Sequence, residues 1–175
     1  MMHPYFFGYG SLVNRTTHDY PQAERARVRG WRRVWQGTSM RKVAYLTAVA
    51  DSGSEIDGLI AAVPGADWTA LDLRERAYLR HKAQADIGRD VQIYAVSAEH
   101  ADPKPDHPIL LSYLDTVIQG YLREFGRYGA QAFFETTAGW HYPIQDDRAD
   151  PIYPRATRLT QGERAFVDLH LGKVR

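Results

Sequence analysis

An aromatic segment near the N-terminus, which ends in a glycine turn, most constrains what this chain can fold into. Residues 4–9 are rich in tyrosine and phenylalanine, a composition that favours a buried β-strand. The strand breaks at Gly10, because glycine permits backbone conformations and close contacts that a Cβ atom excludes. The backbone N–H groups that follow, at Ser11 and Leu12, are then available to an anion. The segment therefore predicts a strand followed by a cradle for a carboxylate or phosphate.

The length and composition of the chain predict a single domain. A chain of 175 residues, of which 44% are hydrophobic, can bury one full core, and we expect one domain over residues 1–175. The absence of cysteine excludes disulfides, thiolate metal sites and a cysteine nucleophile. The seven histidines never fall three or four residues apart within a helix, so we expect no metal site.

The charge and hydropathy patterns indicate neither a membrane nor a nucleic-acid partner. The net charge is +1, and the sequence contains neither a signal-peptide pattern nor an apolar run of 18 residues. We therefore expect a cytoplasmic protein with no membrane and no nucleic-acid partner, and the sequence does not predict its oligomeric state. Contact with RNA phosphates is a weaker alternative, which rests on a basic cluster at Arg25, Arg27, Arg29, Arg32 and Arg33. We favour its interpretation as a strand with one buried and one solvated face.

Strand patterns predominate early in the chain and helical patterns late. We expect strands at residues 4–9, 25–36, 43–50, 56–63, 78–85 and 91–96. We expect helices at residues 67–76, 109–125 and 129–137, and a last one after a capping box of Thr160 and Glu163. A polar turn at residues 51–54 predicts a hairpin between two strands, and Gly30 predicts a bulge. This order predicts an α+β fold in which helices flank a small mixed β-barrel.

Several familiar catalytic motifs are absent. Residues 8–13 lack the third glycine of a dinucleotide fingerprint, and no Gly-Lys-Ser/Thr phosphate loop occurs. Ser11 lacks the spacing of a nucleophile elbow. The sequence therefore gives little support to nucleotide hydrolysis or to a serine nucleophile.

Glu75 is the most promising chemical group. It lies near the C-terminal end of the predicted helix at residues 67–76, where apolar neighbours require one face to be buried. A partly buried carboxyl group has a raised pKa and can transfer protons near neutrality. An alternative is that Glu75 lies at the surface in an ion pair with Arg74, Arg76 or Lys82.

Four further residues have both a structural and a functional interpretation. Ser11 either caps the helix after the turn or contributes to the anion cradle, and the two roles are compatible. Tyr9, Tyr78 and Tyr113 are either core aromatic residues or part of a binding site.

Five segments, in this order, together resemble the γ-glutamylcyclotransferase superfamily of AIG2-like and ChaC-like proteins. They are residues 9–12, 30–35, 57–63, 71–75 with Tyr78, and 109–120 with Tyr113. The segment at residues 9–12 is similar to the signature loop of that family. The segment at residues 71–75 is similar to the one that ends in the catalytic glutamate of the family.

The resemblance implies a small β-barrel enzyme that forms 5-oxoproline from a γ-glutamyl compound. It implies that Tyr9, Gly10, Ser11 and Leu12 hold the γ-glutamyl group and that Glu75 is the general acid and base. Tyr78 and Tyr113 are the remaining substrate-binding candidates. No metal or organic cofactor is implied, because the α-amino group of the substrate is itself the nucleophile. The substrate is a γ-glutamyl amino acid, a γ-glutamyl amine or glutathione.

Two departures from the family pattern bear on the substrate. Arg76 and Ala77 follow Glu75, where many relatives have a glycine, and Leu12 and Val13 stand where many have Asn-Leu. A binding module that holds a small carboxylate without turnover therefore remains an alternative. We expect residues 127–175 to pack on the domain as a C-terminal extension, with residues 140–155 as a packing strap in preference to a lid.

Overall fold

The protein is described by a computed structural model that covers residues 2–104 and 106–175. A sheet of six strands contains β1 (Tyr5–Gly8), β2 (Glu24–Gly37), β3 (Ala44–Ala62), β4 (Tyr78–Ala85), β5 (Arg89–Val96) and β7 (Thr137–Ala138). The main helices are α1 (Thr69–Arg74), α2 (Leu111–Thr136) and α3 (Gln161–Val174), and the short strands β6 (Ile109–Leu110) and β8 (Ile144–Gln145) pair with each other. Short 3₁₀ turns occupy Ser11–Val13, Arg15–Thr17 and Pro64–Ala66.

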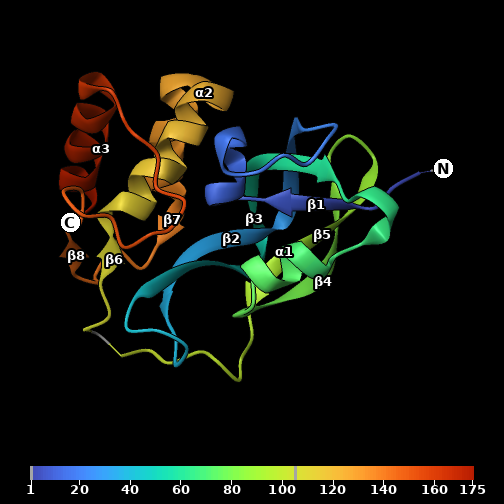
Figure 1. The fold of residues 1–175 in the computed structure, drawn as a ribbon, viewed down its shortest axis with the longest axis horizontal. Coiled ribbons are helices and arrows are strands. Elements are labelled where there is room, and N and C mark those ends of the chain that lie inside the picture. Colours follow the sequence, from blue (N-terminus) through green and yellow to red (C-terminus); the bar gives the residue numbers. More distant parts are fainter. Residues whose placement is uncertain (1, 105) are drawn as a thin grey trace.

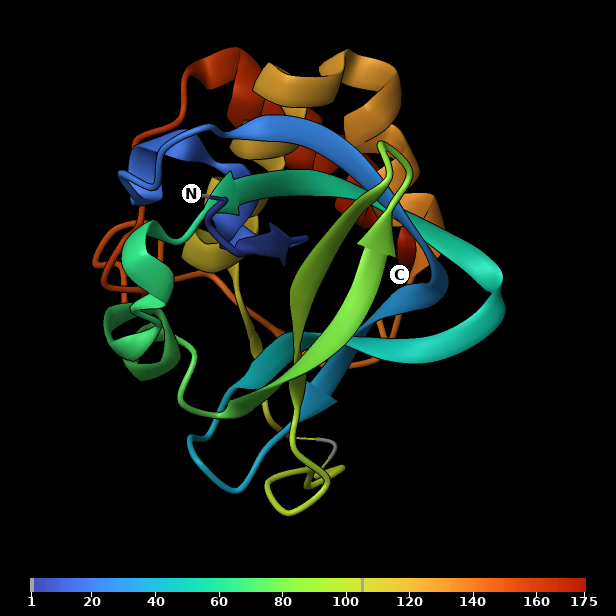
Figure 2. The ribbon, with the colours of Figure 1, turned by 90° about the vertical axis from the view of Figure 1, so that its right-hand side faces the viewer.

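Five of the strands close into a mixed barrel, as the sequence predicts. The order is β3-β1-β5-β4-β2, and β2 pairs again with β3 to complete the circle. The pair β1–β5 is parallel, whereas β1–β3, β2–β3, β2–β4 and β4–β5 are antiparallel. Figure 2 shows β2 and β3 curving together round the barrel while β4 and β5 cross in front of them.

The predicted hairpin at residues 51–54 is wrong, because β3 is one continuous strand. Both of its halves pair with β2, and the register shifts between Arg29 and Trp31, where residues 51–54 lie opposite Gly30. The turn chemistry is nevertheless present, since Asp51 accepts hydrogen bonds from Gly53 N (3.2 Å) and Ser54 Oγ (2.7 Å). The polar turn therefore forms a large bulge that bends β3 without reversing it. The predicted bulge at Gly30 (φ 86°) is part of the same feature.

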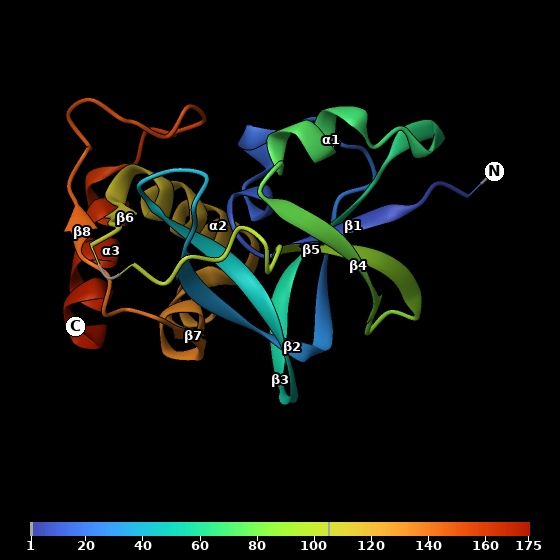
Figure 3. The ribbon, with the colours of Figure 1, turned by 90° about the horizontal axis from the view of Figure 1, so that it is seen from below.

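The helices α2 and α3 lie together at one end of the barrel, and α1 lies beside β1 and β4 (Figure 1). The predicted helices at residues 109–125 and 129–137 correspond to the two halves of α2, which a break at Gly126 (φ 70°) separates. The first turn begins at Leu111 rather than Ile109, because Ile109 and Leu110 pair with β8. Figure 3 shows the loop between β8 and α3 beside the helices, with one bend turned toward the barrel.

The core fills the barrel and continues under α2. Its largest fully buried side chains include Phe7, Trp35, Ile60, Tyr121 and Phe133. A smaller cluster of Phe6, Leu12, Leu71 and Tyr94 lies under α1. Leu12 therefore joins the loop after β1 to the helix that precedes Glu75, which holds the two predicted site segments together.

The predicted capping box begins α3. Thr160 Oγ1 accepts a hydrogen bond from Glu163 N (3.1 Å), and Glu163 Oε1 accepts one from Thr160 N (2.9 Å). We expect Thr160→Ala to lower the free energy of unfolding by about 1 kcal/mol, because one helix N–H loses its partner. Urea denaturation measures this loss. Glu163→Gln keeps an acceptor oxygen and serves as the matched control, with an expected loss below about 0.5 kcal/mol. Equal losses in the two variants would contradict the capping explanation.

Candidate active site

The loop after β1 packs against α2. Gly10 occupies the N-cap position of the turn Ser11–Val13, and no side chain caps that turn. The interpretation of Ser11 as a helix cap is therefore wrong. Its hydroxyl instead accepts a hydrogen bond from Arg74 Nη2 at 3.2 Å. The loop is thus connected to the segment that carries Glu75.

Gly10 is required by the close approach of α2. A Cβ atom at this position would lie 2.6 Å from Tyr113 Oη and 3.2 Å from Leu46 Cδ2. We expect Gly10→Ala to lower the free energy of unfolding by about 1–3 kcal/mol, because the loop or Tyr113 must move. The double variant Gly10→Ala/Tyr113→Phe removes the nearest oxygen and is expected to recover part of that loss. Urea denaturation of both variants and of Tyr113→Phe alone measures the coupling, and strictly additive losses would contradict the steric explanation.

Glu75 lies directly after α1 and faces a pocket. Its side chain is 16% exposed, and Arg74 Nε lies 3.5 Å from Glu75 Oε1. Burial raises the pKa of Glu75, and the positive charges of Arg74 and Arg155 oppose that rise. The predicted pair with Arg74 thus exists, but it lies at the pocket and not on an open helix surface. Glu75 is placed to exchange protons at a higher pH than an ordinary glutamate.

Two hollows meet at Glu75. The larger has a volume of about 320 Å³ and the smaller about 30 Å³. Both are lined by Ser11, Leu46, Glu75, Tyr78 and Tyr113. The smaller hollow is also lined by Tyr9, Gly10 and Leu12. All seven predicted site residues therefore line the smaller hollow, which adjoins the larger one at the shared residues.

The site tyrosines are neutral walls of this cavity. Tyr9 Oη donates to the carbonyl oxygen of Tyr94 (2.5 Å), and Tyr78 Oη donates to that of Leu46 (2.7 Å). Burial, reinforced by the nearby negative charge of Glu75, raises the pKa of Tyr9, Tyr78 and Tyr113. Glu75 is therefore the side chain of the cavity that is placed to exchange protons, with a pKa above that of an ordinary glutamate.

Arg74 connects α1 to the loop after β1, and sequence reasoning did not give it this role. Its side chain is 7% exposed. It donates from Nη1 to the carbonyl oxygen of Thr17 (2.8 Å) and from Nη2 to Thr17 Oγ1 (3.0 Å), in addition to Ser11. An arginine next to Glu75 is the only signal in the sequence, and it suggested no more than an ion pair.

The loop before α3 also reaches the cavity. Tyr153, Pro154 and Arg155 line the larger hollow, and the rings of Tyr153 and Tyr113 pack edge to face with centroids 5.0 Å apart. Sequence reasoning placed residues 140–155 as a strap and did not assign these three to the site. These three residues lie in a loop without regular structure, so the sequence around them has no helical or strand periodicity. The position of such a loop depends on contacts with residues distant in sequence.

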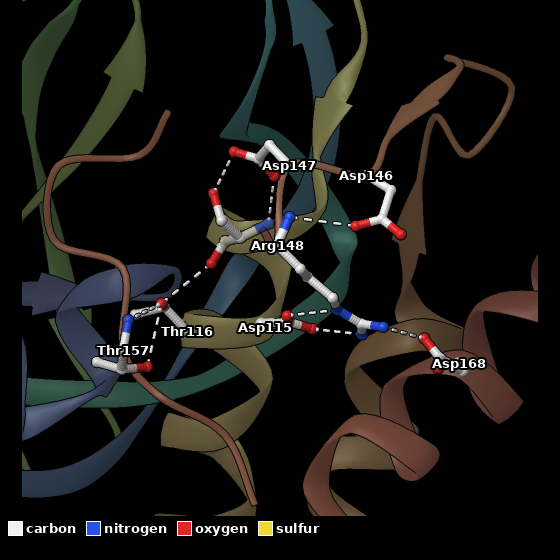
Figure 4. A network of polar contacts seen from close by, with 8 residues as sticks. Asp115, Thr116, Asp146, Asp147, Arg148, Thr157 and Asp168 are labelled. Carbon is white, nitrogen blue, oxygen red and sulfur yellow. Dashed lines mark hydrogen bonds and ion pairs between the residues drawn. The ribbon is translucent and has the colours of Figure 1, made fainter. Parts of the chain in front are cut away.

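The carboxylates of Asp147 in that loop and of Asp115 in α2 bind the loop to the first turns of α2 (Figure 4). Asp147 accepts hydrogen bonds from Ser112 N (2.8 Å) and Ser112 Oγ (2.6 Å). Arg148 donates from Nε and Nη2 to Asp115, each at 2.8 Å, and its Nη1 lies 2.9 Å from Asp168 of α3. The lining residues at 153–155 are thus held by a network immediately before them in the chain.

The basic cluster on β2 is engaged within the fold. Arg27 pairs with Glu55 and Asp57, Arg29 with Glu55, and Arg32 with Asp51. Arg33 is buried and donates to Thr136, Thr137 and Tyr121. Three arginines of the cluster thus lie beside carboxylates of β3, and a fourth is buried.

The described residues show neither a metal cluster nor a helix fit for a membrane. Over residues 2–104 and 106–175, no group of three or more His, Asp or Glu side chains is arranged to hold a metal ion. Among the helices in this part of the chain, none has the length and apolar character needed to span a membrane.

Comparisons with known proteins give one family and one fold. A model of the family "Gamma-glutamyl cyclotransferase, AIG2-like" matches residues 6–114. A solved structure described as a γ-glutamyl cyclotransferase is 14% identical over 95% of this chain and 98% of its own, with a TM-score of 0.57. An uncharacterised human protein is 14% identical over 96% and 99%, with a TM-score of 0.58. A yeast γ-glutamyl cyclotransferase specific to glutathione is 12% identical over 100% and 98%, with a TM-score of 0.51. No curated protein matches the sequence.

Proposed function

The chain belongs to the γ-glutamyl cyclotransferase, AIG2-like family, and we propose that it converts a γ-glutamyl compound to 5-oxoproline and releases the attached amine or amino acid. The observation that carries the proposal is the meeting of Glu75 and the loop at residues 9–12 in one cavity. The substrate class is a γ-glutamyl amino acid, a γ-glutamyl amine or glutathione. Glutathione is included because the yeast protein of similar fold is described as specific to it.

The reaction needs a proton carrier and no protein nucleophile. The α-amino nitrogen of the substrate attacks its own γ-carbonyl carbon, which forms the ring C–N bond. The bond from the γ-carbon to the leaving nitrogen then breaks. The attacking ammonium loses two protons as it becomes the lactam N–H, and the leaving nitrogen gains two and departs as an ammonium, so atoms and charge balance. Because both reacting groups belong to one molecule, the protein mainly has to hold it folded back on itself.

Glu75 is proposed as the proton carrier. Burial raises its pKa, which brings the carboxylate closer in basicity to the ammonium that it deprotonates. The same carboxyl group, once protonated, gives the proton to the leaving amine. Arg74, 3.5 Å away, is proposed to orient the carboxylate, and its positive charge opposes the rise in the pKa of Glu75.

The smaller hollow is proposed to hold the γ-glutamyl group. Gly10 lines this hollow, and its lack of a side chain lets Tyr113 pack close to the loop. Backbone N–H groups of residues 10–12 would donate to the carboxylate or to the oxyanion that develops on the γ-carbonyl. The tyrosines that line the hollow stay neutral, so they do not compete with Glu75 for the proton.

The experiment that tests this proposal is 5-oxoproline release from a panel of γ-glutamyl compounds. The panel contains several γ-glutamyl amino acids, a γ-glutamyl amine and glutathione, and the product is quantified by liquid chromatography. Release from at least one compound supports the proposal. No release from any of them, with binding of a γ-glutamyl compound retained, would replace it with the alternative of a carboxylate-binding module.

A further inference from the structure

The larger hollow has an excess of positive charge. Four arginines line it: Arg41 before β3, Arg74 and Arg76 around Glu75, and Arg155 in the loop before α3. Glu75 is the single carboxylate among the described lining residues. Arg74 is already engaged by Thr17, Ser11 and Glu75. The other three form no ion pair with the described part of the chain, unlike most of the arginines of β2.

Arg41 and Arg76 meet at Tyr45. Burial raises the pKa of Tyr45, and the charges of both guanidinium groups oppose that rise, so both act on the same hydroxyl. The ring of Tyr45 packs edge to face on Tyr78, with centroids 6.0 Å apart. The two arginines are therefore placed beside Tyr45, which lines the larger hollow and packs on Tyr78, a residue that lines both hollows.

Arg155 brings a third positive charge from a different part of the chain. Its charge acts on Glu75, which places it near the proposed proton carrier. It also borders a second, open depression of about 510 Å³ that is lined by Arg123 and Arg158 as well. No carboxylate is among the described residues lining that depression. The positive field therefore extends outward from the cavity, which favours the approach of anions.

The position of Glu75 fixes which part of the substrate meets these arginines. A proton carrier must lie between the attacking and leaving nitrogens. With the γ-glutamyl group in the smaller hollow, the leaving group projects past Glu75 into the larger one, where the arginines lie. Guanidinium groups bind carboxylates in a forked geometry that a neutral side chain does not offer.

We propose that Arg41, Arg76 and Arg155 form a leaving-group subsite that selects γ-glutamyl derivatives of acidic amino acids. This proposal rests on the proposed function and adds the charge of the leaving group to it. Each carboxylate of the released amino acid is held by an arginine from a separate segment. Because these contacts persist from the bound state through the transition state, they act mainly on KM.

Three substrates of nearly equal shape test the proposal. They are γ-glutamyl-glutamate, γ-glutamyl-glutamine and the α-amide of γ-glutamyl-glutamine, whose leaving groups carry two, one and no carboxylates. We expect kcat/KM to fall by about 10-fold for each carboxylate replaced by an amide, the scale of a charge-assisted hydrogen bond. Salt is expected to shrink the preference, since the arginines are exposed. Equal kcat/KM for the three substrates would overturn the subsite and leave the proposed function intact.

Single substitutions test whether the arginines cause the preference for a negatively charged leaving group. Arg76→Gln and Arg155→Gln are expected to reduce the ratio of kcat/KM for the doubly charged and uncharged substrates by about 10-fold each, with most of the change in KM. Arg76→Lys is expected to restore part of the ratio. Arg29→Gln removes an equal charge from a β2 side chain that is 82% exposed, and it is expected to leave the ratio unchanged. A ratio that stays constant in all the variants, or falls equally in Arg29→Gln, would overturn the proposal.

Binding measurements test the leaving-group subsite independently of the proposed catalytic activity. Calorimetry of the three compounds with Glu75→Gln measures affinity without turnover. If the wild type releases no 5-oxoproline but affinity still follows the leaving-group charge, the subsite stands and the proposed function fails. If affinity is equal for the three compounds, or if none of them binds, the subsite is wrong.

Discussion

Glu75→Gln is expected to lower kcat for 5-oxoproline formation by about 10²–10⁴-fold, the usual contribution of a general acid or base. Glutamine has the same shape and still fits beside Arg74, but it can neither accept the ammonium proton nor return one to the leaving amine. Substrate affinity is expected to change little, because the loop at residues 9–12 is intact. Steady-state kinetics and calorimetry measure the two effects separately.

The matched control is Asp72→Asn in α1, the helix that immediately precedes Glu75. Its carboxylate faces Arg80 (2.9 Å) and the hydroxyl of Tyr94 (2.6 Å) instead of the larger hollow. The charge change is identical, so a general electrostatic effect would lower activity in both variants. A rate for Glu75→Gln within about 10-fold of the wild type would be too small a loss for a general acid or base and would exclude Glu75 as the proton carrier.

The pH dependence follows from the direction of the pKa shift. Because burial raises the pKa of Glu75, the acid limb of the kcat profile is expected above the ordinary pKa of a glutamate. Activity rises as pH rises through that pKa, since the ionised form accepts the proton. Arg155→Gln removes a charge that lowers the pKa, so it is expected to move this limb to higher pH.

The free energy of unfolding is expected to fall as pH rises through the pKa of Glu75, whereas activity rises. The folded protein holds the Glu75 proton to a higher pH than the unfolded chain does. The stabilisation that comes from the protonated Glu75 is fully present below the pKa that Glu75 has in the unfolded chain. It is lost as pH rises through the pKa that Glu75 has in the folded protein. Glu75→Gln removes this loss, so the variant is expected to be more stable than the wild type at neutral pH. Thermal unfolding at acid and neutral pH measures the difference.

The sequence predicts the barrel well where local patterns and pairing agree. The strand at residues 4–9, the bulge at Gly30 and the capping box at Thr160 are determined by neighbouring residues, and each is present. The predicted hairpin at residues 51–54 is wrong, because Asp51 and Ser54 form a turn that can either reverse a strand or bulge it. Which of the two occurs depends on the partner strand. The length of β2 extends the pairing past the turn, and no local signal reports that.

The site residues also fall into those that the sequence predicted and those whose position depends on distant contacts. The motif resemblance named seven residues on the loop after β1, at and after α1, and on α2, and all seven line the cavity. Arg41 and residues 153–155 were missed, because they enter the cavity from loops whose position depends on contacts distant in sequence. For residues 153–155 that contact is the network at Asp147 and Arg148, which the sequence shows only as an Asp-Asp-Arg run.

Arg148→Ala is expected to lower the free energy of unfolding by about 3–5 kcal/mol, because it leaves Asp115 buried without its partner. The side chain of Asp115 is 6% exposed and that of Arg148 14%, so water replaces little of the lost interaction. Asp168→Ala removes only the partner that is 57% exposed, and its loss is expected to stay below about 1 kcal/mol. Urea denaturation compares the two variants.

The pH dependence of that loss identifies its cause. Burial already raises the pKa of Asp115, and Arg148 opposes the rise, so removing Arg148 raises the pKa further. The folded variant then holds this proton to a higher pH than the unfolded chain, and its deficit is expected to shrink as pH falls and Asp115 becomes neutral. Because the same network positions residues 153–155, KM is expected to rise together with the loss of stability. A deficit that is independent of pH would instead indicate lost packing of the Arg148 side chain.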